Sequence, residues 1–152
     1  MCVLRAGGVD FDVDTFLATS SFAATSIRRK GELRLITKPD GPRRERSGFT
    51  ADVSVKEWND LPGQIEDARA FLTEHRAELQ RLRSFPGLEI LELDFSMNLR
   101  IGTDQVVVQS DRFPADLLLA AGGVSVDIVV SIYPPPSDGE SPPRPDPPEL
   151  AD

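Results

Sequence analysis

The most regular hydrophobic pattern in the chain lies between residues 60 and 87. Acidic residues stand in its first turns and arginines in its last, which suits the helix dipole, and Pro86 with Gly87 ends it. The spacing of three or four residues predicts one long amphipathic helix. Its buried face is expected to carry Ile65, Ala68, Leu72, His75, Leu79 and Leu82.

Alternating or short apolar runs elsewhere predict strands, and two short stretches predict further helices. Asp12 is a suitable N-cap for the first short helix, and Pro114 stands in the first turn of the second. The predicted strands are residues 2–8, 25–33, 49–55, 88–97, 104–110 and 126–133, and the short helices are residues 10–21 and 114–123. The order βαββαββαβ predicts an α+β fold: a two-layer sandwich in which a mostly antiparallel sheet of about six strands carries three helices on one face.

The fourth predicted strand has a strict alternation of apolar and acidic positions. Leu91, Leu93 and Phe95 are apolar, and Glu92 and Asp94 stand between them. Such a pattern is typical of an antiparallel strand with one face on the core and the other in water. We therefore expect Glu92 and Asp94 to be exposed.

The composition changes after residue 133. Residues 134–152 hold eight of the thirteen prolines and five acids, and Leu150 is their only large aliphatic side chain. Proline favours extended polyproline II structure and cannot donate to a sheet. The sequence thus predicts one domain over residues 1–133 and a solvated, disordered, acidic tail over residues 134–152.

The length, the net charge and the cysteine count of the chain narrow the class of protein. A chain of 152 residues can bury about 70% of its extended surface without disulfides. The formal charge of −8, from 17 basic and 25 acidic residues, disfavours general affinity for nucleic acid. Cys2 is the single cysteine and is expected to be a small buried hydrophobe. Because the chain has neither a long apolar run nor a signal-peptide pattern, we expect a soluble, cytoplasmic protein that does not bind membranes.

The sequence offers little catalytic chemistry. His75 is the single histidine and falls on the apolar face of the long helix, where packed histidines are far commoner than catalytic ones. Asp10, Asp12 and Asp14 resemble the start of a calcium loop, but the glycine and glutamate required at its sixth and twelfth places are missing. Helix capping explains these aspartates more simply. We expect no enzymatic activity, no metal site and no cofactor.

Residues 28–46, which we call the basic segment, carry the opposite charge to the rest of the chain. Eight bases and three acids give it a charge of +5, and the remaining residues sum to −13. Three interpretations stay open: a solvated loop at an edge strand, a docking surface for an acidic protein or for the chain's own tail, and a site for nucleic acid or a small ligand. Nucleic acid is disfavoured because Phe49, just beyond the segment, is the one aromatic residue near it.

Four stretches of the chain follow one another in a characteristic order: "FDVDTFLATSSF", "IRRKGEL", "SGFTADVS" and "FPADLLLAAGGVSVDIVVSIY". The second contains a "KGE" turn at Lys30–Glu32, and the fourth is a helix-glycine-strand close that ends at Tyr133. This order resembles a family of small bacterial domains of unknown function, some of which look like immunity proteins encoded beside polymorphic toxins. The resemblance spans nearly all of residues 1–133 and implies an αβ fold and a toxin-binding role.

The leading hypothesis is a non-catalytic protein-binding module, in the manner of an immunity protein that neutralises a bacterial toxin. A protein of net negative charge is suited to a basic partner. The alternatives are a binder of small ligands or nucleic acid that uses the basic segment, and an uncharacterised domain with no separable activity. The candidate partner-binding residues are Arg28, Arg29, Arg43, Arg44 and Arg46 on one side and Glu89, Glu92 and Asp94 on the other. The sequence leaves open which side is used, and the oligomeric state.

Overall fold

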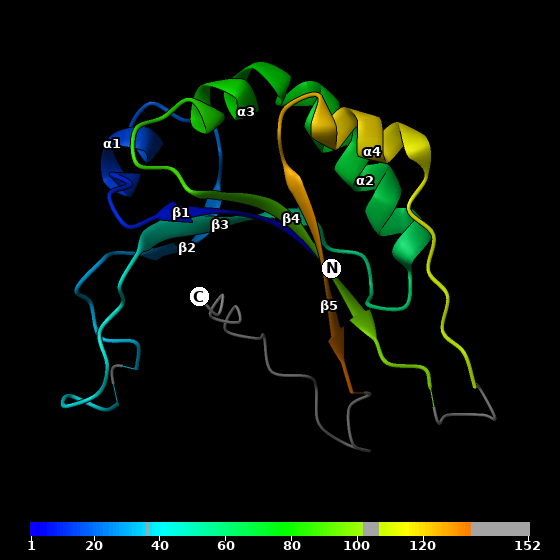
Figure 1. Ribbon diagram of the computed structural model, residues 1–152, viewed down its shortest axis with the longest axis horizontal. Coiled ribbons are helices and arrows are strands. Elements are labelled where there is room, and N and C mark those ends of the chain that lie inside the picture. Colours follow the sequence, from blue (N-terminus) through cyan, green and yellow to red (C-terminus); the bar gives the residue numbers. More distant parts are fainter. Residues whose placement is uncertain (36, 102–106, 135–152) are drawn as a thin grey trace.

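Five strands form one sheet in the order β2-β3-β1-β4-β5 (Figure 1). The computed structural model describes residues 1–35, 37–101 and 107–134, and the structural statements below concern these residues. Every neighbouring pair of strands is antiparallel except β4 and β5, which are parallel. The strands are β1 Cys2–Gly8, β2 Ala24–Arg28, β3 Ser47–Ser54, β4 Ile90–Asn98 and β5 Asp127–Tyr133.

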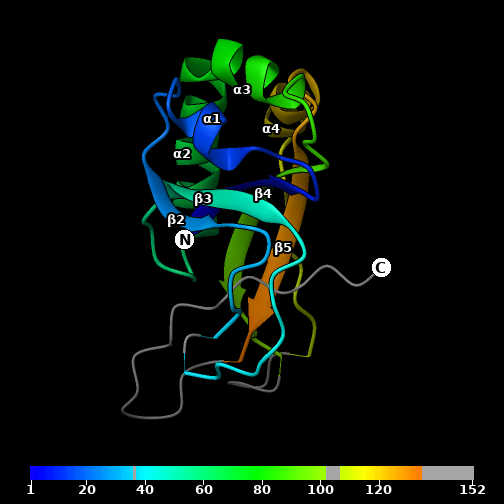
Figure 2. The ribbon, with the colours of Figure 1, turned by 90° about the vertical axis from the view of Figure 1, so that its left-hand side faces the viewer.

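Four helices cover one face of this sheet, so the protein has two layers (Figure 2). The helices are α1 Val13–Leu17, α2 Leu61–Glu74, α3 Arg76–Arg83 and α4 Ala115–Gly122. The predicted α+β class, the mostly antiparallel sheet and the helices on a single face are confirmed. We call the other side of the sheet, which faces away from the helices, the open face.

Strand alternation explains how the helical side becomes the core. Leu4 on β1 pairs with Leu93 on β4, and both side chains are fully buried. Phe49 on β3 is also fully buried and stacks on Phe16 of α1, with their ring centroids 5.8 Å apart. Asp12 caps α1 as predicted, since its Oδ1 accepts a hydrogen bond of 3.0 Å from the Thr15 amide. The cap fixes the short helix where Phe16 can enter the core.

The predicted long helix is two helices, which is a correction to the sequence interpretation. α2 ends and α3 begins at His75, whose φ of −97° and ψ of 16° leave the helical region. Leu72 and Leu79, on either side of this break, are both buried. The change of direction carries the helical layer over the curved sheet as an arch (Figure 1). The hydrophobic spacing survives the break, which explains why periodicity alone did not reveal it.

The strand count is also corrected, from six to five, and the observed order is βαββααβαβ. The sixth predicted strand covered residues 104–110. Residues 104–106 lie outside the described part of the chain, and residues 107–110 belong to no strand. Val107 and Val108 there are 84% and 70% exposed, so this apolar run has no core to join.

The end of β5 at Tyr133 coincides with the predicted end of the domain. Of the predicted tail, residues 135–152 lie outside the described residues. In the part of the chain that is described, no helix is both long and apolar enough to cross a membrane.

Candidate functional site

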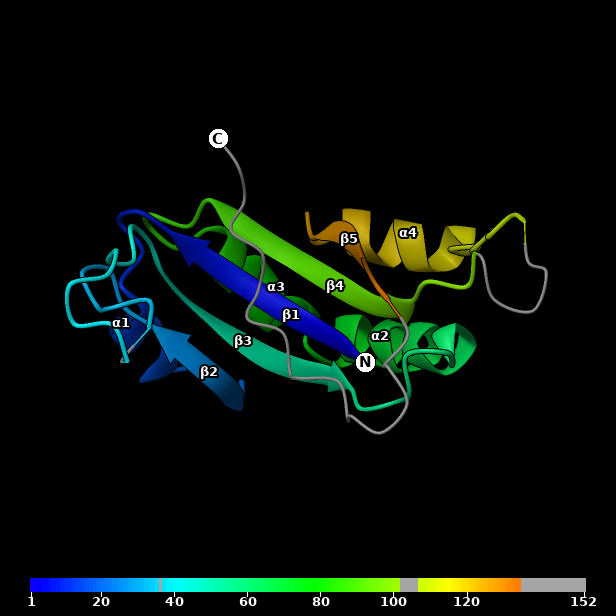
Figure 3. The same ribbon diagram turned by 90° about the horizontal axis from the view of Figure 1, so that it is seen from below.

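The open face, seen from below in Figure 3, carries polar and charged residues that the strand register aligns in rows across the strands. One row joins Ser26 on β2, Thr50 on β3, Arg5 on β1, Glu92 on β4 and Asp127 on β5. Residues that pair across neighbouring strands point to the same face, so this row crosses the whole sheet. The face is therefore polar along its full width, in contrast to the apolar side under the helices.

Arg5 links two acids at the centre of the open face. Its Nη1 lies 3.7 Å from Glu92 Oε1, and its Nη2 forms an ion pair with Asp94 Oδ2. Asp94 is fully buried, and Arg5 and Glu92 are only 8% and 7% exposed. The expectation that Glu92 and Asp94 are exposed is wrong, because β4 lies inside the sheet and the Arg5 side chain lies against both carboxylates.

The charges on this face act on one another. Burial raises the pKa of Glu92 above its ordinary value, and the Arg5 charge lowers it in part. Asp94 and Asp127 add to the rise in this pKa, and Arg28 opposes it. Four charged residues from β1, β2, β4 and β5 thus share one electrostatic environment with Glu92.

Arg28 lies on the edge strand β2, in a row of the open face whose next two positions are glycines. Its row continues through Gly48 on β3 to Gly7 on β1, and neither has a side chain. A Cβ at Gly48 would lie 2.3 Å from the Ala6 carbonyl oxygen, so only glycine fits this close approach of β1 and β3. The structure thus places Arg28 on the same face as Glu92 and Asp94, which the sequence placed on separate surfaces, and the Arg28 charge acts on Glu92.

Other arginines of the basic segment bind atoms near them. The Arg29 guanidinium donates two hydrogen bonds, of 2.8 and 2.7 Å, to the Asp14 carboxylate at the start of α1. Arg43 Nη1 donates to the Gly31 carbonyl at 2.7 Å, and Arg44 Nη2 donates to another carbonyl of the segment at 3.4 Å. These contacts stabilise the basic segment, which forms the hairpin between β2 and β3, and attach it to α1. Arg43 and Arg29 nevertheless remain exposed.

Two candidate residues that the sequence placed on opposite sides, Arg46 and Glu89, lie together at the base of the hairpin. Arg46 Nε is 3.3 Å from Glu89 Oε2, and both side chains are about half exposed, at 40% and 45%. The hairpin projects from the sheet on the side away from the helices, as do the ends of β4 and β5 (Figures 1 and 2). The open face is therefore flanked by the basic hairpin on one side and by the ends of these two strands on the other.

His75 belongs to the helical layer and not to this face. Its ring packs on Phe71 and Phe22, with centroids 4.5 and 5.4 Å apart. Its Nδ1 lies 4.0 Å from Glu78, whose carboxylate accepts hydrogen bonds from the hydroxyl of Ser20, at 2.6 Å, and from the loop after it. Glu78 thus attaches the loop between α1 and β2 to α3. The packing of the His75 ring on Phe71 and Phe22 fits the predicted structural role of this histidine.

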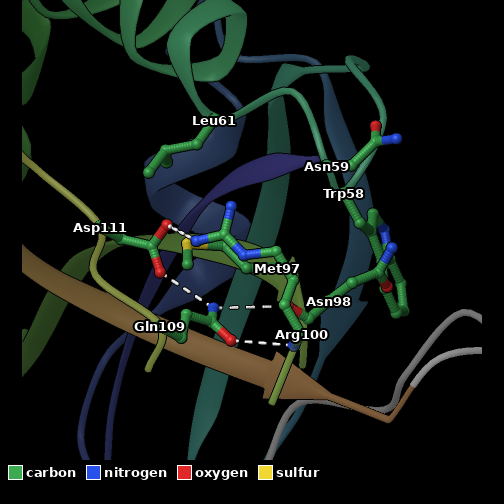
Figure 4. Close-up of a pocket in the computed structure, with 8 residues that line it drawn as sticks. All are labelled: Trp58, Asn59, Leu61, Met97, Asn98, Arg100, Gln109 and Asp111. Carbon is green, nitrogen blue, oxygen red and sulfur yellow. Dashed lines mark hydrogen bonds and ion pairs between the residues drawn. The ribbon is translucent and has the colours of Figure 1, made fainter. Parts of the chain in front are cut away.

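A shallow pocket lies at the far end of the sheet, beside the end of β4 (Figure 4). There Arg100 Nη2 forms an ion pair of 2.6 Å with Asp111, and the Arg100 amide donates to Gln109 Oε1 at 2.9 Å. This network attaches the segment after β4 to the strand end. The space it leaves suits about one water molecule and is far below the size of an organic ligand site.

Arg5, Asp52 and Asp127 are open-face residues that the sequence analysis did not select. Arg5 had a usable signal, since it is a charge in the middle of the apolar run "CVLRA". Asp52 and Asp127 had none, because only the strand register places them beside the others.

Comparisons with known proteins do not assign the chain to a family. No family model matches the chain, and no match is found among curated proteins or solved structures. Among the described residues, no group of three or more histidine, cysteine or acidic side chains is arranged to hold a metal ion. The resemblance to immunity-like bacterial domains stays a prediction.

Proposed function

We propose that this protein is a non-catalytic protein-binding module that docks its partner on the open face. The observation that carries the proposal is the cluster of Arg5, Glu92 and Asp94, on which the charge of Arg28 also acts, at the centre of a sheet face that no described helix covers. Burying such charges costs desolvation energy, and a hydrophobic replacement of equal volume is often at least as stable. A role in recognition accounts for charges that stability does not require.

The partner is proposed to be a protein with a basic surface, in the manner of a toxin bound by an immunity protein. The open face holds four acids, Asp52, Glu92, Asp94 and Asp127, against Arg5 and Arg28. Together with the formal charge of −8, this favours attraction of a basic protein over an acidic one. Because Arg29 binds Asp14 of α1, and Arg43 and Arg44 bind carbonyl groups of the basic segment, nucleic-acid binding is the weaker alternative.

A pair of variants with equal net charge tests the proposal. Asp127→Lys reverses an exposed charge on the open face, and Glu66→Lys reverses an exposed charge on α2 in the helical layer. Each immobilised full-length variant is used to capture proteins from the native cell extract, beside the unchanged chain. We expect one basic protein to be retained by Glu66→Lys and lost or strongly reduced with Asp127→Lys.

Equal retention by both variants would contradict docking on the open face, and so would loss with Glu66→Lys alone. A fluorescent single-stranded oligonucleotide is the probe for the alternative function. If it binds the unchanged chain and Arg43→Glu abolishes this binding, the nucleic-acid function replaces the proposed one.

A further inference from the structure

Strand β5 leaves a row of backbone groups at the edge of the sheet. Leu99 N donates to Tyr133 O at 2.7 Å, so the backbone groups of Tyr133 face β4. In a parallel ladder every second residue faces the same neighbour. Ile128, Val130 and Ile132 therefore direct their N–H and C=O groups outward, away from β4.

The side chains of these three residues form an exposed apolar stripe. They point toward the helical side, since they pair with core residues of β4. Val130 and Ile132 are 40% and 51% exposed, whereas Ile128 is partly buried near α4. The strand has one charged residue, Asp127, at its start. Outward backbone groups and exposed β-branched side chains together form a template for another strand.

The opposite edge of the sheet, β2, has features that oppose such pairing. Its register with β3 shifts between Ala24 and Ser26, which distorts the edge. Thr25 and Ser26 are exposed polar residues, and Arg28 ends the strand. The two edges therefore differ in the property that decides whether a sheet can extend.

We infer that β5 pairs in an antiparallel manner with β5 of a second copy of this chain, about a two-fold axis at Val130. This register sets Val130 opposite its own counterpart and Ile128 opposite Ile132 of the other copy. It joins two apolar stripes into one surface of β-branched side chains, which stabilise each other across strands. It also sets Asp127 opposite Tyr133, so no like charges meet. The inference does not depend on the proposed function.

A second copy fits this edge better than the chain's own end. Eight prolines among residues 134–152 lack the N–H groups that a pairing strand must donate. An identical strand, in contrast, supplies matching outward donors and acceptors and an equal apolar stripe. An isologous contact also closes as a dimer and does not continue into a fibre.

The test is the mass of the full-length protein in solution, measured by size-exclusion chromatography with light scattering over a range of concentrations. We expect a dimer whose dissociation constant rises at least about tenfold in Val130→Lys, because each subunit then brings a charge to the axis. Ile27→Lys on β2 is the control, since Ile27 is also 40% exposed on an edge strand. A monomer at every concentration, or equal weakening by both variants, would overturn the inference.

A conservative variant gives a second readout if Val130→Lys does not fold. In Val130→Cys the two-fold axis sets the new thiols opposite each other, within the Cα separation that a disulfide spans. Oxidised glutathione accepts the two electrons and protons as the two thiols form one disulfide. Cys2 is fully buried and does not compete. We expect covalent dimers from Val130→Cys and much less from Ile27→Cys, and similar yields from both would refute the pairing.

Discussion

The two faces of the sheet are formed by the same strands, but one buries apolar side chains and the other buries paired charges. On β4, Leu93 points under the helices and is buried among apolar neighbours, whereas the adjacent Glu92 and Asp94 are buried beside Arg5 on the open face. Hydrophobic burial stabilises the fold without directional partners, but buried charges stabilise it only while each keeps its partner. Equal burial on the two faces therefore does not imply an equal contribution to stability.

The largest expected effect is on the helical face. Leu93→Ala leaves a cavity among fully buried side chains and should lower the free energy of unfolding by about 2–5 kcal/mol. The comparison variant is Val129→Ala on the half-buried part of the open face, which should cost about 1 kcal/mol. Urea denaturation monitored by circular dichroism measures both. An equal loss in the two variants would mean that the faces do not differ in packing.

The next effect concerns the charge cluster. Arg5→Met removes the cation from between two buried carboxylates, and should cost about 3 kcal/mol at neutral pH. This cost should shrink in acid, because Glu92, whose pKa burial raises, then becomes neutral. The paired variant Arg5→Met/Asp94→Leu should recover most of the loss. If the paired variant is as unstable as the single one, the fold requires these charges for its stability, contrary to the proposal.

The prediction of the fold from sequence succeeded where the signal was local. The cap at Asp12 and the presence of a strand at β4 depend on residues close in the chain. The burial of Asp94 could not be predicted, because its partner Arg5 is on a strand about ninety residues away and only the register joins them. The break at His75 was missed for a related reason, since a kink that keeps the apolar face in phase leaves no trace in the spacing.

A smaller effect should come from pH, through Glu78 in the helical layer. Its partial burial would raise the pKa, but hydrogen bonds from Ser20, Ser21 and Arg81 lower it below the ordinary value of 4.5 overall. The stability from this group is therefore present above pH 4.5 and is lost as the pH falls through the lower folded-state pKa.

Glu78→Gln should accordingly lower the free energy of unfolding by roughly 1 kcal/mol at pH 7 and by much less at pH 3. Unfolding in urea at both pH values measures the difference, with Glu74→Gln on the exposed side of α2 as the control. The same loss for Glu78→Gln at both pH values would exclude a contribution from its ionised form.

The smallest effect is expected from removing residues 135–152. This segment has one large aliphatic side chain, Leu150, and cannot bury much apolar surface. The thermal midpoint of the shortened chain should stay within about 1 °C of the full chain. A clear fall in the midpoint would show that the segment packs on the domain.

The central claim is that the open face binds a partner through its charges. Its most direct test is the association rate of the purified captured partner with Asp127→Lys and with Glu66→Lys, at low and at high salt. We expect Asp127→Lys to associate at least about threefold more slowly than Glu66→Lys at low salt, and we expect the difference in rate to narrow at high salt as the charges are screened. Equal rates for the two variants at low salt would contradict it.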